Sequence, residues 1–207
     1  MIDIVIDQGA NARSIRLDIP RFTLVGATTR SGLLSAPFRS RFGMTARLDY
    51  YSPQALHEIV TRSCRILNVE IDAGGSAEIG RRARGTPRIA NNLLRWVRDY
   101  AQVKADNKIT AEIADQALTM LDIDQNGLDE MDKRILETIL FKFSGGPVGV
   151  NSLAVAVGEE TGTIEEVNEP FLIQEGYLKR TPQGRSVTER CYELFGVKPT
   201  DGQRNLL

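Results

Sequence analysis

The sequence contains few of the cysteines and histidines on which disulfide-rich proteins, zinc proteins and many hydrolases depend. It has only two cysteines, Cys64 and Cys191, and one histidine, His57. Because the cysteines are far apart and form no Cys-x-x-Cys motif, a disulfide framework and a zinc site are both disfavoured. A single histidine makes a Ser-His site or a multi-histidine metal site improbable, so we expect His57 to be structural. Free cysteines of this kind are typical of the reducing cytoplasm.

The chain also lacks a long apolar segment and a large net charge. No apolar run approaches the ~20 residues that a membrane helix needs, so no membrane association is expected. The alternating, acidic N-terminus does not resemble a secretory signal. The formal net charge is -1, yet residues 1–52 hold seven basic and four acidic residues, and residues 126–207 hold nine and thirteen. Net charge therefore says little about partners.

The first part of the chain has the pattern of a β-sheet. Apolar residues alternate on both sides of a Gly-Ala-Asn turn near residue 10, which predicts a hairpin. The apolar run at 22–25 then predicts a buried parallel strand with Thr28 and Thr29 at its carboxyl end. Hydroxyls at that place can orient a water or reach a phosphate, or they can bond to their own backbone.

Helical spacing begins at residue 52. Ser-Pro at 52–53 and Thr-Pro at 86–87 are N-cap and first-turn pairs, and each precedes an apolar stripe. Two further helices are predicted, one starting near residue 76 and one following Thr110. The polar segment DIDQNGLDE marks a boundary near residue 125. Three more helices and a hairpin around Thr-Pro-Gln-Gly follow, in the order of a winged helix-turn-helix.

Two arginines stand one residue apart in APFRSRFG, residues 36–43. Pro37 and Gly43 disfavour a long helix, and on an extended backbone Arg39 and Arg41 would face the same side. No acidic residue lies between positions 30 and 47. This pattern favours an arginine finger that reaches a phosphate on another chain, and solvated surface arginines are the alternative.

Arg88 falls at the second position of a helix whose start is well marked. A cation there opposes the helix dipole by ~0.3–1 kcal/mol, and the free N–H groups beside it can bind an anion. A bound phosphate would reverse the penalty. The alternative is that Arg88 turns to Glu78 or to solvent.

The predicted hairpin at the end of the chain carries Lys179, Arg180 and Arg185 with no acidic residue between them. The helix before it is rich in glutamate, which phosphates would repel from a major groove. We therefore expect any DNA contact to run through the hairpin and the DNA backbone, without base readout. A solvated hairpin without DNA contact is the alternative.

Several segments together resemble the RuvB family of AAA+ motors, which drive branch migration of Holliday junctions. They include LVGATTR, RSRFG, RARGTPRIANNLLRWVRD and LIQEGYLKRTPQGR, and the likeness runs from residue 2 to about residue 199. The resemblance implies an α/β remnant of an AAA+ core at 1–51, an all-α lid subdomain at 52–124 and a winged-helix domain at 125–207. It implies work in recombination, DNA repair and the SOS response.

The resemblance also implies site residues and partners. Arg41 would be the arginine finger for a neighbouring subunit's ATP site, with Arg39 the weaker candidate. Other positions match nucleotide-sensing and DNA-contacting residues: Thr28 and Thr29 in sensor 1, Tyr51 at the nucleotide, Arg88 as sensor 2, and Arg180 and Arg185 in the wing beside Lys179. The implied partners are Holliday-junction or duplex DNA, RuvA at the N-terminal hairpin, RuvC, and six copies of this chain in a ring. Where some relatives carry a basic residue after Gly-Glu-Glu, this chain has Thr161.

One departure from the family pattern is large. The phosphate-binding motif G-x-x-x-x-G-K-[ST] is absent, as is the acidic strand end that binds Mg²⁺ in P-loop ATPases. ATP or ADP with Mg²⁺ is the implied cofactor, so we expect part of a motor that does not hydrolyse ATP alone. The alternatives are another AAA+ protein with a winged helix, such as a replication initiator, or a non-catalytic winged-helix regulator.

Overall fold

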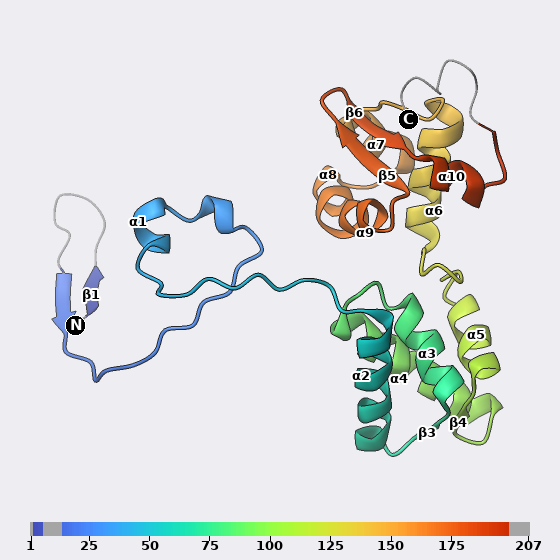
Figure 1. Ribbon diagram of the computed structural model, residues 1–207, viewed down its shortest axis with the longest axis horizontal. Helices are drawn as coiled ribbons and strands as arrows, with labels where there is room; N and C mark the ends of the chain where they lie inside the picture. The colour runs from blue at the N-terminus through green and yellow to red at the C-terminus, as the bar shows by residue number, and fades with distance from the viewer. Residues whose placement is uncertain (1, 6–13, 199–207) are drawn as a thin grey trace. The chain divides into compact units, whose positions relative to one another are not determined.

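The computed structural model describes residues 2–5 and 14–198 and divides into a unit that ends at Leu48 and a unit that begins at Asp49 (Figure 1). In the first unit, β1 (Ile2–Val5) pairs antiparallel with β2 (Ser14–Leu17). The predicted hairpin is confirmed, and its turn lies outside the described residues. The 3-10 turn η1 (Ser31–Leu33) and the short helix α1 (Ala36–Arg39) follow.

The apolar run at 22–25 does not form a strand, so the prediction of a buried strand is wrong for this chain. Phe22, Leu24 and Val25 are all exposed, Val25 at 87%. A parallel strand is held by backbone hydrogen bonds to its neighbours. The described part of the first unit offers this segment no partner strand, so its backbone and its apolar side chains stay uncovered.

The second unit begins with four helices: α2 (Pro53–Leu67), α3 (Ala73–Arg82), α4 (Pro87–Lys104) and α5 (Ala111–Thr119). Side chains of Ser52, Asp72 and Thr110 accept hydrogen bonds from first-turn N–H groups, which helices otherwise leave free. Asp72 starts α3 at Ala73, earlier than predicted. The short strands β3 (Glu70–Ile71) and β4 (Lys108–Ile109) pair in parallel between the helices.

The apolar stripes of these helices meet in one core. Leu56 from α2, Ile79 from α3 and Leu94 from α4 are fully buried there. Burial of a large side chain stabilises a fold by about 1.5–3 kcal/mol, so this core holds the four helices together. The Nδ1 of His57 on α2 lies 2.9 Å from the hydroxyl of Ser76 on α3, so the pair joins the two helices, and the structural role of His57 stays a prediction.

The rest of the second unit is a winged helix. Its first helices are α6 (Glu130–Glu137), continued by the π-helix η2 (Thr138–Lys142), and α7 (Val150–Val157). A continuous helical run follows, made of α8 (Thr161–Thr163), the π-helix η3 (Ile164–Asn168) and α9 (Glu169–Gln174). The wing is the antiparallel pair β5 (Leu178–Thr181) and β6 (Gly184–Val187), and α10 (Glu189–Leu194) follows it. The helices and hairpin are as predicted, and α10 is an addition.

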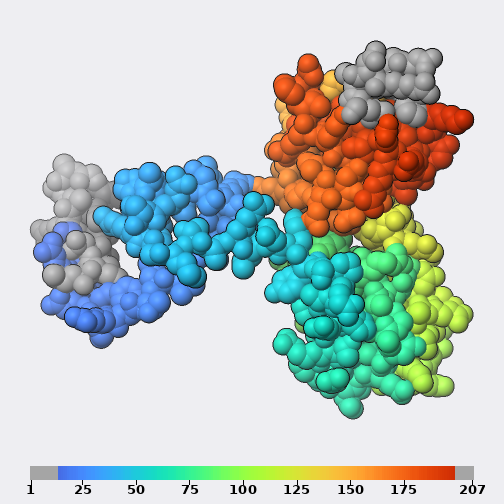
Figure 2. All heavy atoms as spheres, viewed as in Figure 1, coloured from blue at the N-terminus to red at the C-terminus, as the bar shows by residue number. Residues whose placement is uncertain are grey.

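A second core lies inside the winged helix. Ile135, Leu153, Leu172 and Cys191 are fully buried in it, and Figure 2 shows this domain from outside, coloured yellow to red. A backbone bridge between Val148 and β6 ties the segment before α7 to the wing. Among the described residues, no helix is both long and apolar enough to cross a membrane.

Candidate functional site

Arg39 and Arg41 lie on a tight turn, so the extended backbone on which both would face the same side is not formed. Pro37 stands in the first turn of α1, where a helix tolerates it, and Arg39 ends that helix. The Phe38 and Phe42 rings meet edge to face with centroids 5.4 Å apart and brace the turn. Both arginines are exposed, and within the described residues neither side chain makes a hydrogen bond or ion pair. Their charge is available to an anion.

Thr28 and Thr29 occupy an exposed loop next to this turn. A Cβ on Gly26 would lie 3.7 Å from the Phe42 ring, so the two segments are in contact. The Thr28 hydroxyl accepts a hydrogen bond of 3.0 Å from the backbone N–H of Arg30. That is the local bonding kept as the alternative above, and it leaves the Thr28 hydroxyl proton free to donate.

Arg88 is exposed at the second position of α4. Its alternative partner, Glu78, is already paired with Arg81 and Arg82 at 2.5 Å each. Among the described residues, Arg88 makes no side-chain hydrogen bond or ion pair. Thr86 stands at the N-cap, but its hydroxyl donates to a carbonyl two residues earlier and does not cap the helix. The start of α4 therefore presents a cation beside uncapped backbone donors, which suits a phosphate.

Tyr51 is held at the same loop. Its backbone N–H donates to the carbonyl of Gly85 at 2.8 Å, and its side chain is half exposed. Gly85 has φ +67°, and a Cβ there would lie 2.7 Å from the Cβ of Tyr50. Only glycine fits this contact. The structure thus brings Tyr51 and Arg88 to one loop, whereas Arg41 belongs to the other unit.

The wing arginines are paired within the domain. Arg185 places Nε 2.5 Å from Oε1 of Glu169 and Nη2 2.7 Å from Glu165, and its side chain is only 12% exposed. Arg180 binds Glu169 through Nε at 2.7 Å but is 52% exposed. The hydrogen bond with Glu169 raises the pKa of Arg185. Lys179, next along β5, is half-buried.

Glu169 is the partner of the wing arginines that sequence reasoning missed. Its carboxylate is fully buried, and both arginines converge on it. The available signal was the spacing of Glu165 and Glu169, which puts them on one face of a helix next to the basic hairpin. The two charge patterns neutralise each other in part, so the wing is less cationic than its sequence suggests.

A second missed group lies where the helical part meets the winged helix. Arg84 places Nη1 3.0 Å from Asp129 and Nη2 3.0 Å from Asp132. Asp132 is fully buried and accepts a 2.8 Å hydrogen bond from Asn168. Burial raises the pKa of Asp132 to about 6, although the charge of Arg84 opposes the rise. In the sequence, Arg84 shows only as one of three arginines in RARGTPR.

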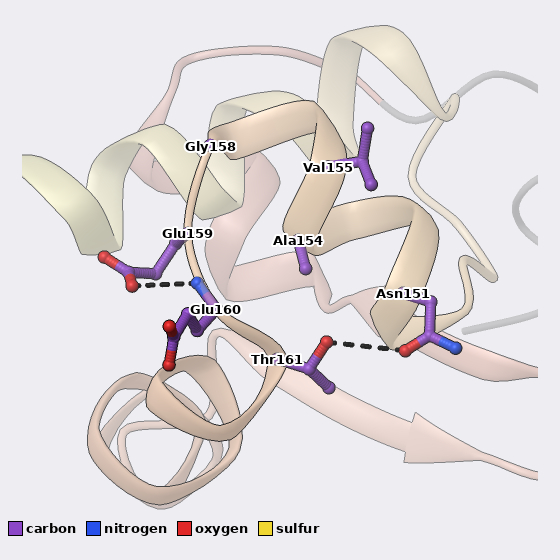
Figure 3. Close-up of a pocket in the computed structure, with 7 residues that line it drawn as sticks. All are labelled: Asn151, Ala154, Val155, Gly158, Glu159, Glu160 and Thr161. Carbon is purple, nitrogen blue, oxygen red and sulfur yellow. Dashed lines mark hydrogen bonds between the residues drawn. The ribbon is translucent and has the colours of Figure 1, made fainter.

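An open pocket of about 510 Å³ lies between α7 and α8 (Figure 3). The hydroxyl of Thr161 lies 3.4 Å from Asn151 Oδ1, and the Glu159 carboxylate accepts from the backbone N–H of Glu160 at 2.8 Å. The lining has two carboxylates and no basic residue. It does not suit an anion, and Thr161 stands where the resemblance would allow a basic residue.

Comparison with known proteins accounts for nearly the whole chain. Residues 1–48 match the model of the Holliday junction DNA helicase RuvB P-loop domain. Residues 51–124 match the RuvB AAA lid domain, and residues 125–196 match the RuvB C-terminal winged helix domain.

Individual relatives agree with the family models. The Holliday junction branch migration complex subunit RuvB of Salinibacter ruber is 60% identical over 194 residues, which cover 94% of this chain and 56% of the relative. The structure of the Thermotoga maritima RuvB motor matches with a TM-score of 0.80 at 48% identity, over 87% of this chain and 60% of that one. A mutant of the same protein gives the same score over 89% and 61%. The chain spans between half and two thirds of these relatives, and it belongs to the RuvB family.

Proposed function

We propose that this chain is the nucleotide-sensing and DNA-contacting part of an ATP-driven motor that moves Holliday junctions. In this division, residues 1–51 supply sensor 1 and the arginine finger, residues 52–124 the lid with sensor 2, and residues 125–207 the DNA-binding winged helix. The start of α4 supports this most, because Arg88 is exposed there, no side chain caps the helix, and Tyr51 is hydrogen-bonded to Gly85 in the loop just before it.

ATP or ADP, bound with Mg²⁺, would supply the negatively charged phosphates that the exposed arginines of this chain would bind. Arg88 would pair with a phosphate held by its own subunit, and Tyr51 would line the same site. Arg41, or less suitably Arg39, would reach the site of a neighbouring subunit, since its guanidinium has no partner among the described residues. Thr28 and Thr29 would orient a water or a phosphate. The described residues hold no cluster of three His, Cys, Asp or Glu side chains, so we assign no Mg²⁺ ligand.

The wing would hold duplex DNA by its backbone. Arg180 is the arginine that can turn from a carboxylate to a phosphate, because half of its side chain is exposed. Lys179 lies beside it on β5. Arg185 is mostly buried between Glu165 and Glu169, so it would position the wing and contact a phosphate only at its edge. Backbone contacts carry no sequence information, which suits a protein that moves along DNA.

The proposed setting is that of the family. Homo-hexameric rings would act with RuvA, docked at the β1–β2 hairpin, and with RuvC, in recombination and in DNA repair during the SOS response in the cytoplasm. The exposed side chains of Ile15 and Leu17 on β2 support a docking role for the hairpin. ATP hydrolysis by the isolated chain is not expected.

Two alternatives make different predictions. A replication initiator of the AAA+ class would prefer one DNA sequence, and a non-catalytic winged-helix regulator would bind a palindromic site as a dimer. A DNA-binding assay with unrelated duplexes as competitors separates the proposed motor from both alternatives, because the motor would show no preference for a DNA sequence.

The test is ATP-driven dissociation of a synthetic four-way junction by a RuvB protein that carries these residues behind a P-loop domain. Arg88→Ala is expected to slow dissociation about 100-fold, since a preorganised cation is lost from the phosphate, while DNA affinity stays unchanged. Arg81→Ala is the matched control, because Arg81 lies on α3, is 43% exposed and pairs with Glu78. Equal rates for the two variants would contradict the proposal.

A further inference from the structure

The loop that precedes Arg88 is also fastened to the winged helix. Arg84, four residues before Arg88, has φ +55°, an unusual conformation for a residue with a side chain. Its side chain is only 12% exposed and reaches Asp129 and Asp132 at the start of α6, each at 3.0 Å. The strained backbone aims the guanidinium away from the helical part and into the winged helix.

Arg84 contacts a second helix of the winged helix as well. Its guanidinium carbon lies 4.2 Å from the centroid of the Phe171 ring on α9. A cation over an aromatic face is attracted to it, more strongly when both are shielded from water. One side chain therefore touches both α6 and α9.

The acceptor of this contact is built into the domain. Asp132 is fully buried, and Asn168 donates a 2.8 Å hydrogen bond to it. Asp129 and Asp132 also cap each other's backbone N–H groups at the start of α6. A buried carboxylate that loses its cation is costly, so Arg84 is held in place far more firmly than a surface ion pair would be.

The loop is anchored at its other end to the linker between the domains. Arg82 is fully buried, and its Nη1 donates to the carbonyl of Ile123 at 3.1 Å. It also pairs with Glu78 and Asp115. A Cβ on Gly127 would lie 3.1 Å from the carbonyl oxygen of Arg82, so the linker packs against the same residue.

We propose that Arg84 is the coupling residue of this protein: its contacts with Asp129, Asp132 and Phe171 transmit movements of the loop before Arg88 to the winged helix as a rigid unit. The part of this statement that concerns nucleotide rests on the proposed function. Without Arg84, the linker near residues 123–128 would be the main connection between the helical part and the winged helix. The linker would then bend when the loop moves, and the winged helix would not follow the movement.

The rigid connection can be measured in this chain without nucleotide or DNA. Spin labels at Val103→Cys on α4 and Val155→Cys on α7 would report the distance between the two parts, since both valines are exposed. The native Cys64 and Cys191 are buried, which raises their pKa to about 11 and about 12 and protects them from labelling. We expect a narrow distance distribution that broadens at least twofold in Arg84→Gln and not in Arg81→Gln. An unchanged distribution in Arg84→Gln would overturn the proposal.

The functional arm uses a RuvB protein with a P-loop domain. Arg84→Gln is expected to leave the affinity for nucleotide and the affinity for DNA near their original values. The ratio of DNA affinities with an ATP analogue and with ADP should fall about tenfold toward one, within the range of known coupling energies. A merely structural role would lower stability and leave this ratio unchanged, and that result would overturn the coupling.

Two further variants keep the test decisive. Asp132→Asn removes the charge at the other end of the contact. Combining Arg84→Gln with Asp132→Asn should broaden the distance distribution no more than the more severe of the two single changes does. If Arg84→Gln does not fold, Arg84→Lys keeps the charge but loses the paired geometry, and it should give a partial broadening. A broadened distribution with no nucleotide response in any RuvB protein would contradict the proposed function and leave the mechanical connection standing.

Discussion

At the scale of single residues, buried carboxylates decide what the nearby arginines can do. Arg180 and Arg185 lie opposite each other in the wing, and both bind Glu169, yet only Arg180 is half exposed. An exposed arginine can exchange a carboxylate for a phosphate at little cost. A guanidinium enclosed between two glutamates cannot do so without leaving a buried charge unpaired.

Arg180→Ala should therefore weaken DNA binding, and it should reduce the slope of log affinity against log salt by about one. Arg185→Ala should change the slope less and lower the free energy of unfolding by about 1–3 kcal/mol, because the buried Glu169 loses a partner. Filter binding at several salt concentrations and urea unfolding measure the two effects. Equal slopes for both variants would show that burial does not separate the two arginines.

Asp132 should make stability depend on pH in a defined direction. Its pKa is about 6 in the fold against an ordinary 3.8, because burial disfavours the charged form. Between these values the folded state holds a proton that the unfolded state has released, so stability from this group falls as pH rises from 4 to above 6.

Asp132→Asn removes this titrating group. The free energy of unfolding of the variant, relative to that of the original chain, should therefore rise by about 2–3 kcal/mol between pH 4 and pH 7.5. Urea unfolding of both proteins across this range measures the difference. Parallel pH profiles would contradict the raised pKa.

At the scale of elements, the loop between α3 and α4 and the two helix ends that flank it make several contacts at once. Arg82 holds the linker, Arg84 reaches the winged helix, Gly85 receives Tyr51, and Arg88 faces solvent. The loop takes this path because residues 84 and 85 both adopt positive φ.

Gly85→Ala should destabilise the fold by about 1–3 kcal/mol, since its φ is +67° and the new Cβ would meet Tyr50. In a RuvB protein with a P-loop domain it should also weaken nucleotide binding, because Tyr51 and Arg88 depend on the loop. Gly162→Ala is the control, as nothing lies within 4 Å of a Cβ there. Thermal unfolding and nucleotide titration measure both effects, and equal behaviour of the two variants would contradict the role of the loop.

The helices and strands also show which parts of the fold could be predicted from the sequence. The starts of α2 and α5 follow from Ser52 and Thr110, because a cap is a hydrogen bond within one turn. The wing follows equally from its turn residues. The prediction of a buried strand at 22–25 was wrong, because such a strand depends on neighbouring strands that its own residues cannot specify.

At the scale of the whole molecule, the proposed ring would complete each site with a residue from the next subunit. Arg41 is exposed and without a side-chain partner among the described residues. In a RuvB protein with a P-loop domain, Arg41→Ala should abolish ATP hydrolysis by the ring while nucleotide binding persists. A steady-state ATPase assay with a parallel binding titration measures this.

Mixing Arg41→Ala subunits with subunits whose P-loop is inactivated should restore some hydrolysis, because mixed interfaces pair an intact P-loop with an intact Arg41. Arg39→Ala serves as the comparison for the weaker candidate. Absence of any rescue would argue that Arg41 acts within its own subunit or has no part in hydrolysis.

The sequence by itself determined most helices of the second unit, the two hairpins and the place of Arg88 at the start of a helix. These depend on caps, spacing and turn chemistry, all of which act over a few residues. Tertiary structure alone decided that Glu169 and Glu165 enclose Arg185 and that Arg84 reaches Asp132. Such pairings join residues far apart in the chain, and burial sets their strength, so they exist only once the domains are packed.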